Sequence, residues 1–180
     1  GYINKNIVAR LQAEHCNALG LCGADGDSIL AHKRQNPLMD YGFAGDIDQV
    51  QSDILYQLLQ QNISVVVAPI THDGQGQLLN TNADTIAQEL AKAMSHLYDT
   101  VLIYSFEKKG VLSDINDENA VIPVIDTVSY QSLKASQKIF AGMIPKLDNA
   151  FMAINSGVKK VVIVTDEPEK YDGAEIQASL

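Results

Sequence analysis

A run of largely apolar residues at positions 63–70, Ile-Ser-Val-Val-Val-Ala-Pro-Ile, constrains the fold more than any other feature of the sequence. A continuous stretch of β-branched side chains is typical of a strand buried on both faces, as the central strands of parallel sheets are. Parallel neighbours cannot be joined by a tight turn and need a crossover connection, which is usually a helix. The run therefore predicts a central parallel strand in an α/β fold.

Hydrophobic periodicity in the rest of the chain predicts strands that alternate with helices. We expect further strands at residues 18–22, 28–32, 100–104, 122–125 and 161–165, and helices at 4–17, 50–61, 83–97, 129–140 and through Ile154. A polar loop follows the strand at 28–32, turn residues predict a hairpin at 71–79, and the tail ends in a short edge strand at 173–176. Such alternation implies a mostly parallel central sheet flanked by helices, a three-layer α/β sandwich. No repeat or low-complexity linker interrupts the pattern, so we predict one domain over residues 1–180.

Charge and cysteine content narrow the classes of partner. The net charge of −9, with acidic and basic residues mixed along the chain, argues against nucleic acids and anionic membranes, which need a basic face. No apolar run is long enough to span a bilayer. Cys16 and Cys22 lack metal-ligand spacing, so reduced, buried thiols are expected rather than a disulfide or a metal site. These features predict a cytoplasmic protein.

Three loops with unusual composition lie where ligands bind in open parallel sheets, beyond the carboxyl ends of strands. The first, residues 80–84, reads Asn-Thr-Asn-Ala-Asp where the predicted hairpin meets a helix. A helix start suits an anion, and the two Asn side chains suit a carboxylate and an amide. Asn80 and Asn82 are also candidate caps of this helix. Asp84 either stabilises the helix dipole or orients nearby lysines by ion pairing.

The second and third loops carry lysines. Residues 142–146 read Gly-Met-Ile-Pro-Lys, and Pro145 suits a first helical position. Lys146 then stands at a helix N-terminus, where the dipole opposes its charge by up to about 1 kcal/mol. A bound polyphosphate or Asp84 would offset that cost, and the alternative is a solvated lysine. The third loop, residues 105–112, suits either a nucleotide or a plain surface turn. The sequence contains no Walker-type or G-x-G-x-x-G motif, and its histidines share no metal or triad spacing.

In combination, these segments resemble the acetylglutamate kinase branch of the amino-acid kinase family. The resemblance extends from residue 1 to about residue 165 and rests on the order and spacing of short segments at 2–5, 20–26, 40–46, 67–70, 80–84 and 142–146. The Asn-x-Asn-Ala-Asp and Gly-Met-Ile-Pro-Lys pair is the most specific part of it.

The resemblance implies a reaction and a set of site residues. The reaction is transfer of the γ-phosphoryl group of ATP, bound with Mg²⁺, to the γ-carboxylate of N-acetyl-L-glutamate, a step of arginine biosynthesis. It also suggests a homodimer. Carried over onto this chain, the roles are catalytic for Lys146 and Asp84, substrate-binding for Asn80 and Asn82, and nucleotide-binding for Ser105, Phe106, Glu107, Gly110, Met143 and Ile144.

The chain departs from the family pattern in several places. The family begins with a Lys-x-Gly-Gly loop, a second glycine-rich loop and an arginine that grips the substrate carboxylate. None of these is in the chain. Either upstream residues are missing from it or it is a fragment that cannot be active as it stands, and we expect omission or truncation rather than a naturally reduced domain. Ala24 stands where many relatives have Lys, and Phe106-Glu107 stands where Thr-Asp is usual. The acyl group on the glutamate and arginine feedback are not readable from these residues. Another kinase of the family (for carbamate, UMP, aspartate or glutamate) and a non-catalytic ligand-binding domain stay as alternatives.

Overall fold

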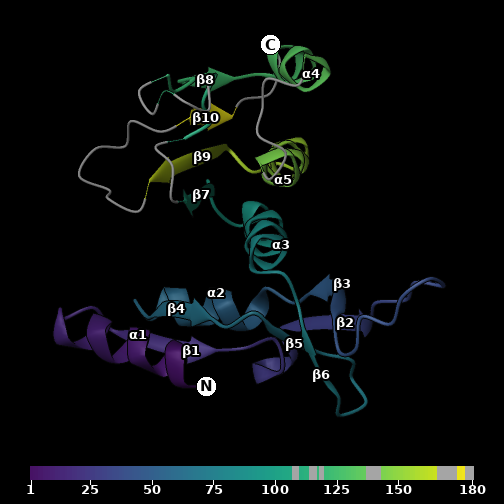
Figure 1. The fold of residues 1–180 in the computed structure, drawn as a ribbon. Coiled ribbons are helices and arrows are strands. Elements are labelled where there is room, and N and C mark those ends of the chain that lie inside the picture. The colour runs from purple at the N-terminus through teal and green to yellow at the C-terminus, as the bar shows by residue number, and fades with distance from the viewer. Residues whose placement is uncertain (107–109, 114–116, 118–119, 137–142, 166–173, 177–180) are drawn as a thin grey trace. The chain divides into compact units, whose positions relative to one another are not determined.

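The structure, a computed structural model, describes residues 1–106, 110–113, 117, 120–136, 143–165 and 174–176 (Figure 1). The chain divides into two compact units, Gly1–Ala93 and Met94–Leu180, and each is described by itself. The prediction of one domain over residues 1–180 stays a prediction.

The first unit begins with a helix that is pinned to a pair of parallel strands. The elements are α1 (Tyr2–Ala13), β1 (Ala18–Leu21), α2 (Asp53–Gln60) and β4 (Ser64–Val67), and β1 pairs with β4 in parallel. Buried Asn4 donates from Nδ2 to the Val66 carbonyl at 2.8 Å, and Lys5 donates to the Gly20 carbonyl at 2.7 Å. A Cβ atom on Gly20 would lie 2.0 Å from the Asn4 side-chain oxygen. Gly20 is therefore the residue that lets α1 approach the strands.

The apolar run that predicted a central strand forms two strands instead of one. β4 ends at Val67, and β5 (Ile70–His72) begins after Pro69, which has no N–H to donate to a sheet. The predicted parallel pairing of this run is confirmed by its register with β1. The predicted burial on both faces is wrong, because Ser64 is exposed and the three valines are only half-buried.

A four-stranded sheet completes the first unit, with the order β3-β2-β5-β6. Its other strands are β2 (Ile29–Lys33), β3 (Gly45–Val50) and β6 (Leu78–Asn80), and a 3₁₀ turn, η1 (Asp25–Asp27), precedes β2. β5 and β6 form the antiparallel hairpin predicted at 71–79. The sequence predicted a loop where β3 lies, because the stretch after residue 32 is polar and contains Pro37. The helix expected from residue 50 begins at Asp53.

The second unit is a four-stranded sheet with helices, in the strand order β7-β9-β10-β8. Its elements are β7 (Val101–Phe106), β8 (Val124–Ile125), α4 (Thr127–Ala135), α5 (Ile144–Asn155), β9 (Lys160–Thr165) and β10 (Ala174–Ile176). α3 (Ala83–Ser95) crosses the boundary between the units. β7 and β9 are parallel, as are β10 and β8, whereas β10 is antiparallel to β9. The fully buried core of this unit includes Ile125, Leu147, Ala150, Val161, Ile163 and Ile176.

The sequence predicted that the tail strand lies at the edge of the sheet, and this prediction is wrong. β10 lies between β9 and β8, and Ile176 is fully buried in the core. The α/β class is confirmed, since helices accompany parallel strand pairs in both units. No helix among the described residues is long and apolar enough to cross a membrane.

Candidate functional site

In the first unit, the end of β6 is joined to the start of β3, which closes the four-stranded sheet on itself. Ala44 and Asn80 form an isolated parallel bridge, and the Asn80 N–H donates to the Phe43 carbonyl at 2.7 Å. The bridge therefore connects the first and last strands of the order β3-β2-β5-β6. It fixes the backbone of Asn80 while leaving its side chain exposed.

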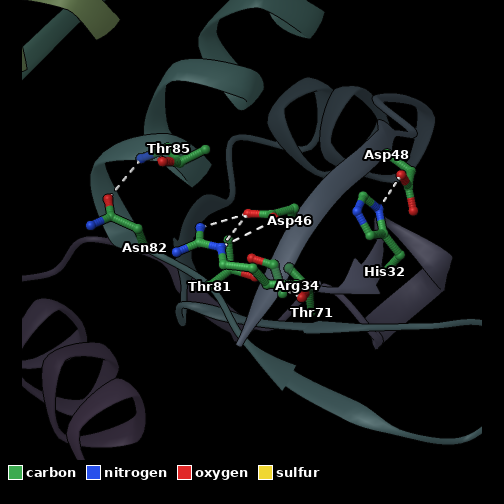
Figure 2. A network of polar contacts seen from close by, with 9 residues as sticks. His32, Arg34, Asp46, Asp48, Thr71, Thr81, Asn82 and Thr85 are labelled. Carbon is green, nitrogen blue, oxygen red and sulfur yellow. Dashed lines mark hydrogen bonds and ion pairs between the residues drawn. The ribbon is translucent and has the colours of Figure 1, made fainter. Parts of the chain in front are cut away.

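Two buried threonines and a glycine hold this closure together (Figure 2). The hydroxyl groups of Thr71 and Thr81 lie 2.9 Å apart, and the Thr81 hydroxyl donates to the Gly45 carbonyl at 3.2 Å. A Cβ atom on Gly45 would lie 2.8 Å from both Leu79 Cβ and Thr81 Oγ1. The strands can approach this closely only because residue 45 has no side chain.

The segment 80–84 includes the last residue of strand β6 and the first residues of helix α3. Asn82 Oδ1 accepts a hydrogen bond from the Thr85 N–H at 3.1 Å, so Asn82 caps α3, as one of the two predicted cap candidates (Figure 2). Asn80 ends β6 and does not cap the helix. Asp84 is half-buried in the first turn of α3, where a negative charge is favourable against the dipole. Three of the predicted site residues thus meet at one helix start.

Two side-chain pairs that the sequence analysis did not identify join β3 to β2 and to Arg34, the residue after β2 (Figure 2). Arg34 donates to Asp46 through Nε at 3.0 Å and through Nη2 at 2.6 Å, and His32 Nδ1 lies 2.6 Å from Asp48 Oδ1. The hydrogen bond from Arg34 holds the pKa of Asp46 below its usual range, and the same bond raises the pKa of Arg34. The alternation of Asp46 and Asp48 around Ile47 is the signal that would have predicted this strand, whereas its partners depend on the register with β2.

In the second unit, the structure brings the predicted lysine to the end of a predicted strand. Lys146 is the third residue of α5, and its Nζ lies 5.7 Å from the centre of the Tyr104 ring on β7. Ser105 follows Tyr104 toward the carboxyl end of the same strand. A cation over an aromatic face is attracted to it, and this contact holds the ammonium group near the strand end.

The other predicted nucleotide-binding residues are only partly described. Met143 is buried directly before α5, Ile144 begins the helix, and Gly110 is buried. Phe106 ends β7, whereas Glu107 lies outside the described residues. A helix start, a lysine and the carboxyl end of a parallel strand therefore come together within this unit, and this combination suits a phosphate group.

The expectation of no protein-held metal is not tested by the structure. Among the described residues, no group of three or more His, Cys, Asp and Glu side chains is arranged to hold a metal ion. Cys16 and Cys22 are free thiols and are half-buried.

Comparison with known proteins identifies relatives along most of the chain. Over 173 residues the chain is 53% identical to the acetylglutamate kinase of Bacteroides fragilis, covering 96% of the chain and 66% of that protein. It is 51% identical over 173 residues to the acetylglutamate kinase of Parabacteroides distasonis, covering 96% and 68%. The crystal structure of smu.665 from Streptococcus mutans UA159 superposes with a TM-score of 0.80 at 26% identity, over 97% of the chain and 66% of that structure.

The chain spans about two thirds of the length of the curated relatives it matches, 66% in the case of the B. fragilis protein. Residues 1–165 match the amino acid kinase family. That match covers every segment that carried the resemblance seen in the sequence. With the Parabacteroides relative, it shows that the chain belongs to the amino acid kinase family.

Proposed function

We propose that this protein transfers the γ-phosphoryl group of ATP to the γ-carboxylate of an N-acyl-L-glutamate, with N-acetyl-L-glutamate as the foremost acceptor. The observation that carries the proposal is the 53% identity to a protein named acetylglutamate kinase, over a stretch that includes all of the predicted site residues. The acyl phosphate that results would serve arginine biosynthesis in the cytoplasm.

The reaction needs positioning and charge neutralisation rather than covalent catalysis by the protein. A γ-carboxylate oxygen attacks the γ-phosphorus, the bond to the bridging oxygen of ADP breaks, and the products are an acyl phosphate and ADP. The acceptor is already ionised at neutral pH, so no general base is required. What the site must supply is positive charge and N–H donors aimed at the moving phosphoryl group.

The described side chains fit these requirements, with one residue neutralising charge and others binding the nucleotide. Lys146, at the start of α5, would neutralise charge on the phosphoryl group as it moves between the two oxygens. Ser105, Gly110, Met143 and Ile144 would line the nucleotide near the end of β7. The Mg²⁺ ion that accompanies ATP would neutralise further charge on the phosphate oxygens.

The acceptor would be held by the segment 80–84 of the first unit. The exposed amide of Asn80 can donate to a carboxylate and accept from an amide N–H, both of which an N-acylglutamate presents. Asn82 shares this role only in part, because its side-chain oxygen already accepts from Thr85. Asp84 would have a catalytic role, as the family resemblance implies. We also propose a homodimer, in keeping with the family resemblance.

The proposal is tested by measuring ATP-dependent release of ADP by the full-length gene product. N-acetyl-L-glutamate, N-succinyl-L-glutamate, glutamate, aspartate, carbamate and UMP are offered separately. Turnover confined to one N-acylglutamate would support the proposal and identify the acyl group. Turnover with another acceptor would overturn the substrate but keep phosphoryl transfer. No turnover by a folded, full-length protein would favour a non-catalytic binding domain.

A further inference from the structure

A polar cluster between α4 and α5, in which Tyr130 is buried and Lys134 and Asp148 are partly exposed, has no part in the function proposed above. Tyr130 on α4 donates its hydroxyl hydrogen to Asp148 Oδ1 on α5 at 2.7 Å. The same hydroxyl oxygen lies 3.4 Å from the carbonyl oxygen of Ile144, the first residue of α5. Lys134 donates to both carboxylate oxygens of Asp148, at 3.0 and 3.2 Å.

The cluster is anchored by packing as well as by hydrogen bonds. Tyr130 is 2% exposed, and its ring stacks on Phe151 with the centres 5.0 Å apart and 18° between the planes. Burial and the contact with Asp148 raise the pKa of Tyr130, so its hydroxyl keeps its proton and donates at neutral pH. Burial acts to raise the pKa of Asp148, but hydrogen bonds from Tyr130 and Lys134 outweigh it and hold that pKa below the usual range. Donor and acceptor are thus both in the required state.

The start of α5 lacks the side-chain cap that α4 has, although Pro145 stands in its first turn. The α4 helix begins with a capping box. The Asp126 side chain accepts from the Ser129 N–H, and the Ser129 hydroxyl oxygen accepts from the Asp126 N–H. The residue before α5, Met143, makes no side-chain cap bond. Without a side-chain cap, the first turn of a helix is held less firmly and frays more readily. Lys146 adds to this, because its charge opposes the dipole there.

The two contacts of the Tyr130 hydroxyl bracket Lys146 along the helix. Ile144 precedes Lys146 by two residues and Asp148 follows it by two, so the hydroxyl meets the chain on both sides of the lysine. The hydroxyl has one hydrogen and donates it to one acceptor at a time, so the 2.7 Å bond to Asp148 is the tether that restrains the start of α5, and the Ile144 carbonyl oxygen at 3.4 Å is the weaker alternative acceptor. The position of the ammonium group depends on the first turn of this helix, and a displacement of about 1 Å can cost about a hundredfold in rate.

We propose that Tyr130, acting through Asp148 and the first turn of α5, is a positioning residue that holds Lys146 where phosphoryl transfer needs it. This inference rests on the proposed function, since it assigns Tyr130 a role in the same reaction. Lys134 supports it by fixing the Asp148 carboxylate, and Phe151 by fixing the tyrosine ring.

The first test removes only the hydroxyl. In the full-length gene product, Tyr130→Phe keeps the ring on Phe151 and should lower kcat about tenfold, with the KM for the acylglutamate within about twofold. Tyr2→Phe, which removes a hydroxyl from a side chain that is 84% exposed, is the matched control and should leave kcat unchanged. A wild-type kcat in Tyr130→Phe would overturn the inference.

Two further variants separate positioning from general stability. In a Lys146→Ala background, Tyr130→Phe should cause no additional fall in kcat, because its effect acts through the lysine; an undiminished fall would overturn the inference. Asp148→Asn keeps an oxygen for the tyrosine and should retain most of the activity. Asp148→Leu has a similar size and no acceptor, and should match Tyr130→Phe. Equal activity of the Asn and Leu variants would contradict the role of the hydrogen bond.

A measurement that does not depend on activity distinguishes this inference from the proposed function. If the wild-type protein phosphorylates no N-acylglutamate, the proposed function fails, and hydrogen exchange still tests the tether. Tyr130→Phe should speed exchange at the amides of residues 148–150, which close the first turn of α5, relative to those of residues 153–155. Equal change at both ends, or none, would overturn the inference whatever the activity.

Discussion

Lys146 has the most demanding chemical role of any single residue, because its charge stands near a helix start, where the dipole opposes it, and would neutralise the moving phosphoryl group. We expect Lys146→Ala to lower kcat by about a hundredfold or more, as the loss of transition-state charge stabilisation does. Steady-state kinetics of the full-length protein measures this, with Lys159→Ala as the control. Lys159 is an exposed lysine paired with Asp99, and its loss should leave turnover intact. Unchanged turnover in Lys146→Ala would remove that lysine from the mechanism.

Asn80 permits a test of the acceptor site that leaves the fold undisturbed. Its backbone N–H makes the bond to Phe43, and this bond survives a change of side chain. We therefore expect Asn80→Ala to raise the KM for the acylglutamate with little change in unfolding midpoint. Asn82→Ala should in addition cost about 1 kcal/mol of stability, because it removes the cap of α3. An effect of Asn80→Ala on the KM for ATP alone would mean that the two sites are misplaced.

The Arg34–Asp46 pair predicts a pH dependence of stability with a definite sign. The folded-state pKa of Asp46 lies below its usual value because Arg34 donates to it. The pair therefore stabilises the fold above the unfolded pKa of about 3.9, and this contribution is lost as pH falls through the folded pKa. Both side chains are partly exposed, so Asp46→Asn should cost no more than about 1 kcal/mol at pH 7. Urea unfolding at pH 7 and at pH 3 should show the difference shrink; a difference independent of pH would contradict this account.

Among the elements, the closure of the four-stranded sheet depends on how closely β3 approaches β6. We expect Gly45→Ala to destabilise the protein by about 1–3 kcal/mol, because the new methyl group would overlap Leu79 and Thr81. Ala44→Gly, at the adjacent bridge residue, is the control and should cost less. Urea unfolding compares the two variants. If Gly45→Ala is as stable as wild type, the strands are not in the contact that the structure describes.

At the scale of the whole molecule, the predicted site residues belong to two compact units. Asn80, Asn82 and Asp84 are in Gly1–Ala93, whereas Ser105, Met143 and Lys146 are in Met94–Leu180. We expect a non-hydrolysable ATP analogue to slow hydrogen exchange around residues 143–148, and N-acetyl-L-glutamate to slow it around residues 80–85. Each ligand is added alone to the full-length protein. If the ATP analogue protected residues 80–85 and N-acetyl-L-glutamate protected residues 143–148, the two proposed binding sites would be assigned the wrong way round.

Features set by neighbours along the chain were predictable from the sequence by itself. The Asp73-Gly74 turn predicted the β5–β6 hairpin, and helical spacing together with Asn82 predicted α3 and its cap. The order of the short segments also indicated the amino acid kinase family, which the comparison confirmed. In the hairpin and the helix cap the interacting groups are a few residues apart, so spacing and residue type suffice to predict them.

Only the tertiary structure decided the contacts between residues far apart in sequence. The bonds of Arg34 with Asp46 and of Tyr130 with Asp148 join different elements, and the position of β10 between β9 and β8 depends on the path of the whole second unit. The same holds for the approach of Lys146 to Tyr104. No local pattern specifies such pairs, because the free energy that selects them comes from packing that forms only when the elements assemble.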